Sequence, residues 1–459
     1  MDDTRTPEAT EKADTTATTA RAGTAGMAGT AGMAGTSGMA GTANAAATAG
    51  LTGAPGPADA ATPTAAPGAE TTGVLDEALE RLHAAGPERQ GWLSNHAPMA
   101  VEALVRHGHA PRVHRWLDGY RAKLEDMPAP RARVTPENWR EALGDPTRIA
   151  DWTGYFERDT AARPWREVLA EWWPRLLPGI AGGATHPVIR VGHAVRTLLT
   201  GGETAPRVTE LAHALGYWAA RHQPLPPLTL LDPSPHAPGA PARPAPLAHP
   251  ALPTHPTTPT HPAPPASPAP FGTPDRLVPV PASAALDAVA AVPDQSAGIR
   301  HRLAQLTALP RWGADGADPD TARARLTELV AAATHRYATH GHGEPVMLVH
   351  AATAPNAVLR ALPALPRSLW APSVGAAWAA SAAVTAAYTP AAPAAYAAYA
   401  TGAAYAAGAA PDPGEVFARA AAHGDDHAIK FADTALDVGD PLALTAAALA
   451  VELIGPDAA

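Results

Sequence analysis

Apolar residues recur at three- and four-residue steps in five segments of the chain. These segments cover residues 75–82, 99–106, 166–173, 208–215 and 322–330. Such spacing gathers apolar side chains on one face of an α-helix, so each segment is predicted to be helical, with that face packed inward. No segment alternates apolar and polar residues with a period of two over a useful length. The pattern therefore predicts an all-α fold.

Two stretches interrupt this helical pattern. Residues 1–73 repeat Thr-Ala-Gly-Met-Ala-Gly and contain almost no large apolar side chains, so this tail is predicted to be disordered. Residues 223–274 alternate Pro with Thr, His and Ala, which predicts a polyproline-type surface loop and not a strand. A helical half over 74–222 and another over 275–459 remain. The loop's four histidines are expected in solvated coil, without the fixed geometry of a metal site: His236, His249, His255 and His261.

The two helical halves share short blocks in the same order. His96-Ala-Pro-Met-Ala-Val resembles Thr353-Ala-Pro-Asn-Ala-Val, and Thr185-His-Pro-Val-Ile-Arg resembles Asp426-His-Ala-Ile-Lys with one gap. Alanine-rich helices also resemble one another by chance. Two interpretations therefore stay open: a chance similarity, or two related halves with the chemistry located where they meet.

Composition narrows the class of protein. Hydrophobic residues make up 46% of the chain, which is ample for a core, and a net charge of −9 argues against nucleic acid as a partner. The chain has no cysteine, which excludes disulfides and thiolate chemistry. The first residues lack the apolar core of a signal peptide, and the Ala/Tyr-rich stretch 374–410 is too weakly apolar for a membrane helix. We expect a soluble, cytoplasmic protein that does not bind membranes.

Lysine is unusually rare in this chain. The three lysines are Lys12, Lys123 and Lys430, against 31 arginines. Arginine cannot lose its proton in a protein, whereas a buried lysine can become a neutral amine. Lys430 follows His427 by three residues, so the two share a helix face. A neutral amine there could act as a base, form a Schiff base, or take up carbon dioxide to become a carbamate that offers oxygen ligands to a metal.

Five histidines occur where a ring could face inward. These are His96, His186, His193, His350 and His427. His186 and His193 are seven residues apart, about two helical turns, so both project from one face. Neutral imidazoles combined with oxygen ligands suit iron, zinc or manganese. A single histidine in a helical protein is more often a surface or hydrogen-bonded core residue, so both interpretations stand at this point.

Several blocks of the chain resemble the questin oxidase-like family. They are Ser94-Asn-His-Ala-Pro-Met, Gly182-Gly-Ala-Thr-His-Pro-Val-Ile-Arg, His193-Ala-Val-Arg, Leu211-Ala-His-Ala-Leu-Gly-Tyr-Trp-Ala and Asp426-His-Ala-Ile-Lys. The resemblance runs from about residue 75 to the end and leaves out the tail and the Pro-rich segment. It implies an oxidoreductase of secondary metabolism that acts on aromatic polyketides, notably anthraquinones, by Baeyer–Villiger-type or ring-cleaving chemistry.

In one branch of that family, the resemblance implies a non-haem iron site. Fe(II) is held there by four histidines and a lysine whose amine carries a carbamate derived from CO2. Carried over to this chain, the lysine is Lys430. The histidine ligands are His96, His186, His193 and His427, with His350 in reserve. Ala97 and Pro187 stand where the family pattern has glycine, which affects the backbone beside two of these histidines.

The implied oxygenase would join dioxygen to a polyphenol or quinone ring held beside the metal. Trp152, Tyr155 and Trp218 are candidate pocket walls, although each is more often simply core. Arg190, one turn after His186, is a candidate to orient a phenolate or quinone oxygen, with surface exposure as its plainer explanation.

Two alternatives remain. One is an NADPH-dependent Baeyer–Villiger monooxygenase. Because no Gly-x-Gly-x-x-Gly follows a strand, its reductant would come from a reductase partner or bind in an unfamiliar way. The other is a non-catalytic helical binding protein.

Overall fold

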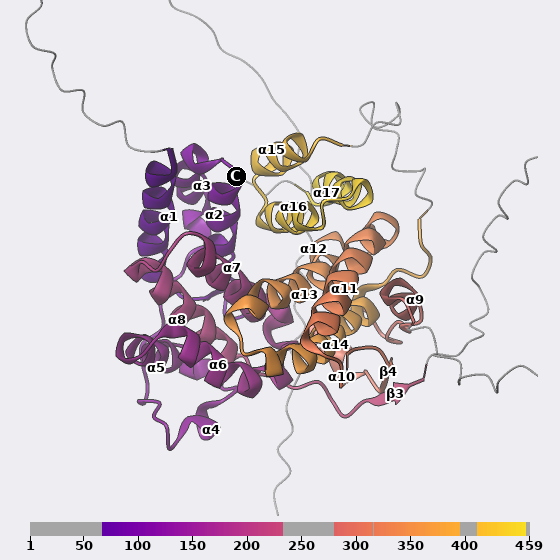
Figure 1. Ribbon diagram of the computed structural model, residues 1–459, viewed down its shortest axis with the longest axis horizontal. Helices are drawn as coiled ribbons and strands as arrows, with labels where there is room; N and C mark the ends of the chain where they lie inside the picture. The colour runs from indigo at the N-terminus through magenta and orange to yellow at the C-terminus, as the bar shows by residue number, and fades with distance from the viewer. Residues whose placement is uncertain (1–66, 233–279, 315, 395–410, 456–459) are drawn as a thin grey trace, which may run out of the picture. The chain divides into compact units, whose positions relative to one another are not determined.

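The chain folds into helices joined by short connections, which confirms the all-α prediction (Figure 1). The computed structural model describes residues 67–232, 280–314, 316–394 and 411–455. The helices of the first half are α1 (Pro67–His83), α2 (Ala97–Arg106), α3 (Val113–Tyr120), α4 (Trp139–Ala142), α5 (Ile149–Ala162), α6 (Trp165–Leu176), α7 (His186–Thr200) and α8 (Ala205–Ala220). Those of the second half are α9 (Ala282–Asp287), α10 (Ile299–Ala304), α11 (Pro319–His340), α12 (Pro345–Leu348), α13 (His350–Ala361), α14 (Trp370–Tyr388), α15 (Pro413–His423), α16 (Asp426–Val438) and α17 (Pro441–Leu453).

The strands in the described residues are only two or three residues long. β1 (Glu88–Arg89) pairs antiparallel with β2 (Leu93–Ser94), and β3 (Thr229–Leu231) pairs parallel with β4 (Ala308–Pro310). β3 lies in the segment predicted to form a loop without a strand, so that prediction needs correction for these three residues. Polyproline and β backbones have similar dihedral angles, so an extended Pro-rich segment can pair wherever a neighbouring backbone is available.

The boundaries predicted from composition fall close to the described elements. α1 begins at Pro67, inside the segment 1–73 that was assigned to the tail, and the rest of that tail lies outside the described residues. Most of the Pro-rich segment, including its four histidines, also lies outside them.

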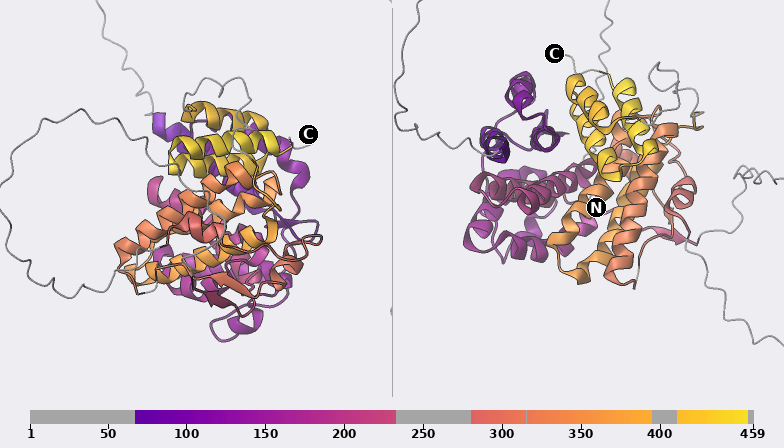
Figure 2. Two further views of the ribbon diagram at one scale, coloured as in Figure 1. Left: turned by 90° about the vertical axis from the view of Figure 1, so that its right-hand side faces the viewer. Right: turned by 45° about the horizontal axis from the view of Figure 1, so that its top comes forward.

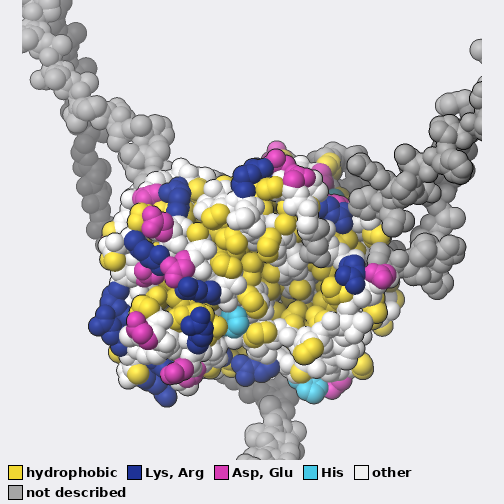
Figure 3. Space-filling model, turned by 60° about the horizontal axis from the view of Figure 1, so that its bottom comes forward, with side chains coloured by type: hydrophobic (Ala, Val, Ile, Leu, Met, Phe, Trp, Pro, Cys, Tyr) yellow, Lys and Arg dark blue, Asp and Glu magenta, His cyan; other side chains and the backbone are white. Residues whose placement is uncertain are grey.

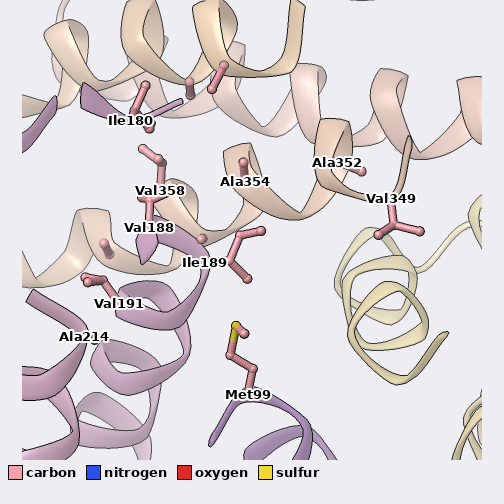
Figure 4. Packing of buried hydrophobic residues seen from close by; sticks show 14 of the residues in the cluster. Met99, Ile180, Val188, Ile189, Val191, Ala214, Val349, Ala352, Ala354 and Val358 are labelled. Carbon is pink, nitrogen blue, oxygen red and sulfur yellow. The ribbon is translucent and has the colours of Figure 1, made fainter. Parts of the chain in front are cut away.

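Four helices form the centre of the described structure: α2, α7, α13 and α16. α7 packs against α2 and α13, and α16 packs against the same two helices. A side chain at Gly192 of α7 would overlap Ala357 of α13, so glycine permits this close approach. Figure 4 shows Ile189 of α7 beside α13, with Met99 of α2 pointing toward it. These helices carry the blocks that the two halves share, so the halves meet at the centre.

Several of the remaining helices pack directly against the central four, and Figure 2 shows the described helices from two further sides. α8 packs against α7 and α5 on one side, and α11 and α14 pack against α13 on the other. α15 and α17 pack against α16. Polar groups that point between the central helices are therefore removed from solvent.

The ends of α16 are set by its sequence. Asp425 caps its start, where the side chain accepts from the backbone N–H groups of His427 and Ala428 at 2.8 and 3.1 Å. Gly439 ends it in a left-handed conformation at φ 78°, which glycine adopts without strain. His427 and Lys430 therefore lie in the first turns of a helix whose start is fixed.

No helix within the described ranges is long and apolar enough to cross a membrane. On the face shown in Figure 3, basic and acidic side chains are mixed around a central apolar area.

Candidate metal centre

Four histidine rings, three of them buried and that of His427 12% exposed, meet where the central helices begin. His96 immediately precedes α2, His186 and His350 are the first residues of α7 and α13, and His427 lies in the first turn of α16. The ring centroid of His96 lies 4.5 Å from the centroid of His186 and 4.5 Å from that of His427. The His350 centroid lies 4.4 Å from that of His186 and 5.5 Å from that of His427. We call these four residues the histidine cluster.

The nitrogen atoms of this cluster have metal-ligand spacing. One ring nitrogen from each of His96, His186 and His427 lies within 4.8 Å of the other two. His350 joins them through its Nε2 atom, 2.9 Å from Nε2 of His186. Three ring nitrogens thus have the mutual spacing of metal ligands, and His350 contacts this set through His186.

A strained turn places His186. Gly183, Ala184 and Thr185 all have left-handed backbones, with φ of 56°, 53° and 68°. Ala184 and Thr185 carry a Cβ, so each costs about 1–2 kcal/mol in this conformation. The turn brings the carbonyl oxygen of Gly183 to 2.7 Å from Nδ1 of His186. Such strain persists only where the surrounding structure fixes it, and it is common at functional sites.

The hydrogen bonds of His186 and His350 determine where their protons lie. Nδ1 of His350 lies 3.0 Å from the carbonyl oxygen of Met347, much as Nδ1 of His186 faces Gly183. A carbonyl oxygen only accepts, so both Nδ1 atoms carry the proton. Burial, with neighbouring cationic groups, lowers the pKa of both rings well below 6.5, so both are neutral. The two Nε2 atoms, 2.9 Å apart, then face each other with lone pairs only, and a cation beside both would remove their repulsion.

Asp426 lies beside the Nδ1 atoms of the other two rings. Its Oδ1 lies 2.6 Å from Nδ1 of His96 and 2.8 Å from Nδ1 of His427. Burial would raise the pKa of this carboxyl, but His96 and His427 hold it well below its usual 3.8. Nε2 of His96 is buried and has no hydrogen-bond partner among the described residues. A carboxylate behind a ligating histidine is the usual support in metal sites.

Sequence reasoning did not identify Asp426. The available signal was its position directly before His427 in the block Asp426-His-Ala-Ile-Lys. A carboxylate beside a candidate ligand in the first turn of a helix can reach that ligand's ring, and here it reaches a second ring as well.

Lys430 is fully buried next to the histidine cluster. Its relative exposure is 0%, and its Nζ has no hydrogen-bond partner within the part of the chain that the structure describes. Burial lowers its pKa from 10.5 to about 8, although Asp426 and Asp425 oppose the shift. Its charge also lowers the pKa of His96, His186 and His350, which indicates that the ammonium group lies near all three. A buried amine that is readily deprotonated can form a carbamate.

The structure does not bring His193 to the histidine cluster. Its Nδ1 lies 2.7 Å from Oε2 of Glu102, and its Nε2 lies 3.2 Å from Nη1 of Arg360. The seven-residue spacing does put His186 and His193 on one helix face, but two turns separate them by about 10 Å along the axis. The seven-residue spacing correctly predicted that His186 and His193 share a helix face. It did not account for the distance between them along the helix axis.

His193 belongs to a second buried polar group. We call it the ionic layer; its residues are Glu102, Arg106, His193, Arg196, Arg360, Asp433 and Asp437. Glu102, His193 and Asp433 also have metal-ligand spacing. The guanidinium of Arg196 contacts both carboxylates, with its Nη2 3.3 Å from Nδ1 of His193. A cation thus already lies among these three side chains.

The other predicted site residues make contacts elsewhere. Arg190 donates from Nε and Nη2 to Glu210 of α8 at 2.6 and 2.8 Å, and both residues are buried. Trp152 and Tyr155 pack with the aromatic rings of α5 and α6. Trp218 packs against Trp173 and donates to the carbonyl of Gly179 at 3.4 Å. Their proposed roles in binding a substrate remain predictions.

The two departures from the family pattern fit the helices they begin. Ala97 and Pro187 lie in the first turns of α2 and α7, where helical backbone suits both residues. Neither change displaces its neighbouring histidine from the cluster.

An all-α protein with a buried polyhistidine centre is the class that this architecture defines. A family model described as questin oxidase-like matches residues 93–435, well over half of the chain. The chain therefore belongs to the questin oxidase-like family, and the matched range contains the whole histidine cluster and Lys430. Membership indicates an oxidoreductase that acts on aromatic polyketides. No curated protein matches the chain.

Proposed function

We propose that this protein is a non-haem metal-dependent oxygenase that uses dioxygen to cleave or oxygenate the ring of an anthraquinone-like polyketide. The metal is Fe(II), and its protein ligands are His96, His186, His350, His427 and a carbamate on Lys430. The observation that carries the proposal is the contact between the neutral rings of His186 and His350. Their Nε2 atoms face each other at 2.9 Å, and both Nδ1 protons are already donated to carbonyl oxygens. A cation between these rings is the simplest account of that arrangement.

The residues present fit such a metal. Burial lowers the pKa of His96, His186 and His350, so these three rings are neutral, whereas Asp426 raises the pKa of His427 against the effect of burial, and a bound metal would displace the extra proton of that ring. Four imidazole nitrogens with one anionic oxygen donor would form a borderline-to-hard set that suits Fe(II). Bound there with an open position, the metal supplies activation of dioxygen. The carbonyls of Gly183 and Met347 accept the Nδ1–H groups of His186 and His350, which leaves Nε2 of these two rings free to bind. Oδ1 of Asp426 lies 2.6 and 2.8 Å from Nδ1 of His96 and His427, so Nε2 would be the binding atom in these rings too. The surrounding helices exclude water from the cluster.

Lys430 completes the site in this proposal as an anionic ligand. With a pKa of about 8, roughly a tenth of its amine is neutral at pH 7, and the neutral amine is the form that reacts with carbon dioxide. The amine nitrogen bonds to the carbon of CO2 and loses a proton, which converts a buried cation into a buried carboxylate-like anion. That anion offsets charge on a divalent metal, whereas an ammonium group beside it would repel the metal.

His350 takes the place that the sequence alone assigned to His193. His350 shares a 2.9 Å nitrogen–nitrogen contact with His186, while both ring nitrogens of His193 face the ionic layer. The two assignments make opposite predictions for metal content.

Elemental analysis of purified protein tests the proposal. Wild-type protein and His193→Ala should carry about one iron per chain, and His350→Ala should carry little. Intact mass under gentle conditions should show the added mass of one carbon dioxide in wild type but not in Lys430→Arg, which keeps the charge and cannot form a carbamate. A metal-free wild type whose properties do not respond to a chelator would favour a non-catalytic binding protein.

The requirement for NADPH separates the remaining alternative. Oxygen uptake with an anthraquinone substrate should proceed without a nicotinamide cofactor. The described strands form only two small pairs, which do not make a dinucleotide-binding sheet. Strict dependence on NADPH would support a Baeyer–Villiger monooxygenase that relies on a partner or on an unfamiliar cofactor site.

A further inference from the structure

The ionic layer lies in the same four helices as the histidine cluster. Glu102 of α2 follows His96 by six residues, and Asp433 of α16 follows His427 by six. Arg196 of α7 and Arg360 of α13 each follow their helix's cluster histidine by ten. At 1.5 Å per residue, the layer lies about 9–15 Å along the helices from the cluster. Every helix that carries a proposed ligand therefore also carries a member of this layer.

Arg196 joins three of these helices. From α7 it donates to Glu102 of α2, with Nε 3.0 Å from Oε1 and a second contact through Nη2. Its Nη1 and Nη2 donate to Asp433 of α16 at 3.1 and 2.9 Å. The side chains of Arg196 and Glu102 are both 8% exposed, and that of Asp433 is 0% exposed. The planar guanidinium thus spans two carboxylates from two other helices.

Arg360 attaches the fourth helix. From α13 its Nη2 donates to Asp433 and Asp437 of α16, each at 2.6 Å. Its Nη1 lies 3.2 Å from Nε2 of His193 on α7. Arg196 and Arg360 together connect α2, α7, α13 and α16 through shared carboxylates.

The layer is electrically balanced within itself. It contains three carboxylates, Glu102, Asp433 and Asp437, and three arginines, of which Arg106 is the most exposed at 36%. The desolvation of buried ion pairs offsets most of their attraction, so their net contribution to stability is small. What a multidentate buried network can supply instead is a fixed relative position of the elements it joins.

We propose that Arg196 and Arg360 are positioning residues for the metal centre. They join the four helices about 9–15 Å along the helix axes from the cluster. In this way they hold the imidazoles of the histidine cluster in the arrangement that binds a metal. This inference rests on the proposed metal site, and neither arginine touches the metal or the substrate.

The test measures metal geometry with Co²⁺ as the probe. Arg196→Lys keeps the charge, but its single ammonium cannot hold two carboxylates in the planar arrangement of a guanidinium. We expect its Co²⁺ affinity, from competition with a chelator, to fall about 2–30-fold, the range for coupling carried through packed helices. The ligand-field absorption of the bound Co²⁺ should also change.

Arg207→Lys is the matched control. Arg207 of α8 has a side chain 2% exposed and donates to Asp76 of α1 at 2.7 Å and to the carbonyl of Gly201 at the end of α7, so it anchors buried helices without joining the central four to one another. Its substitution should lower the melting temperature without changing Co²⁺ affinity or absorption. If Arg196→Lys does not fold, Arg360→Lys provides the same comparison.

The outcomes separate the two proposals. Wild-type Co²⁺ affinity and absorption in a destabilised Arg196→Lys would overturn the positioning role and leave the metal site intact. A wild type that binds no Co²⁺ would overturn the proposed function, and this inference with it. Loss of affinity in Arg207→Lys equal to that in Arg196→Lys would also overturn the positioning role, since any loss of stability would then have the same effect.

Discussion

The histidine cluster and the ionic layer are two buried polar groups on the same four helices, and they differ in how completely their members are paired. In the ionic layer, each of the three arginines meets a carboxylate, and Glu102, Asp433 and Asp437 are each held by at least one arginine. In the cluster, Nε2 of His96 and Nζ of Lys430 lack partners among the described residues. Because unpaired buried polar atoms cost free energy, a fold keeps them where a ligand will complete them.

The comparison also shows why metal-ligand spacing alone is a weak criterion. Both groups contain a set of three side chains with suitable spacing. In the ionic layer, Arg196 already supplies the positive charge. Burial would raise the pKa of Glu102, but Arg196 and His193 outweigh burial and lower this pKa to about 2. In the histidine cluster, His186 and His350 donate their Nδ1 protons to carbonyl oxygens and turn their Nε2 lone pairs toward each other. The direction of these lone pairs, more than the spacing, supports the proposed metal centre.

The largest expected effect separates His350 from His193. His350→Ala should weaken metal binding by more than about a hundredfold, beyond the loss typical of outer-shell partners, because it removes a proposed ligand. Isothermal titration of metal-free protein measures it. His193→Ala is the matched variant in the ionic layer and should keep the metal. The reverse pattern would restore His193 as the ligand.

The next effect is on the ionic layer alone. Asp433→Asn removes a fully buried carboxylate that contacts Arg196 and Arg360, and it should destabilise the metal-free protein by about 3–5 kcal/mol because the arginines are left under-paired. Urea unfolding measures it. A loss below about 1 kcal/mol would show that the layer is not a tightly paired network.

The stability of the metal-free protein should depend on pH through Lys430, which lies beside the histidine cluster. Burial depresses the pKa of Lys430 from 10.5 to about 8, so the unfolded chain binds a proton more tightly than the folded one. The stability of metal-free protein should therefore rise between pH 8 and 10.5, by up to about 3 kcal/mol, and the penalty is fully present below pH 8. Denaturant unfolding of wild type and Lys430→Met across this range measures the difference. Parallel pH profiles for the two proteins would contradict it.

The smallest of these effects concerns Asp426. Asp426→Asn should weaken metal binding about 10–100-fold, because an amide oxygen supports two imidazole N–H groups less well than a carboxylate. Asp425→Asn is the control, since Asn also caps helices and Asp425 lies 3.6 Å from Nδ1 of His427. Equal losses in both variants would show that overall charge matters and that the specific contacts do not.

The sequence predicted the helices well because their apolar residues keep a regular period. It also singled out His96, His186, His427 and Lys430, which the structure brings together through capped or Pro-initiated helix starts. The four helices that carry the shared blocks pack together, while the place of the chemistry stays a prediction. Helix positions and helix starts depend on residues that are close in the chain, so patterns within one segment predict them.

Features that depend on several helices at once were not predictable from local patterns. The choice between His350 and His193 depends on height along the bundle, which residue spacing within one helix does not give. The left-handed backbone at Ala184 and Thr185 contradicts the preferences of both residues, so only the surrounding contacts can impose it. The pairing of β3 with β4 joins residues about eighty positions apart, and the Pro-rich sequence contains no pattern that predicts it.

All four central helices, α2, α7, α13 and α16, begin at the histidine cluster. The start of a helix carries a partial positive charge of about half an elementary charge, so these ends together disfavour a bare dication and favour anions. A metal ion should therefore enter this site more readily together with negative charge than alone. A lysine carbamate and an ionised phenol are both anions of this kind, so the helix dipoles would couple the binding of carbon dioxide, metal and substrate to one another.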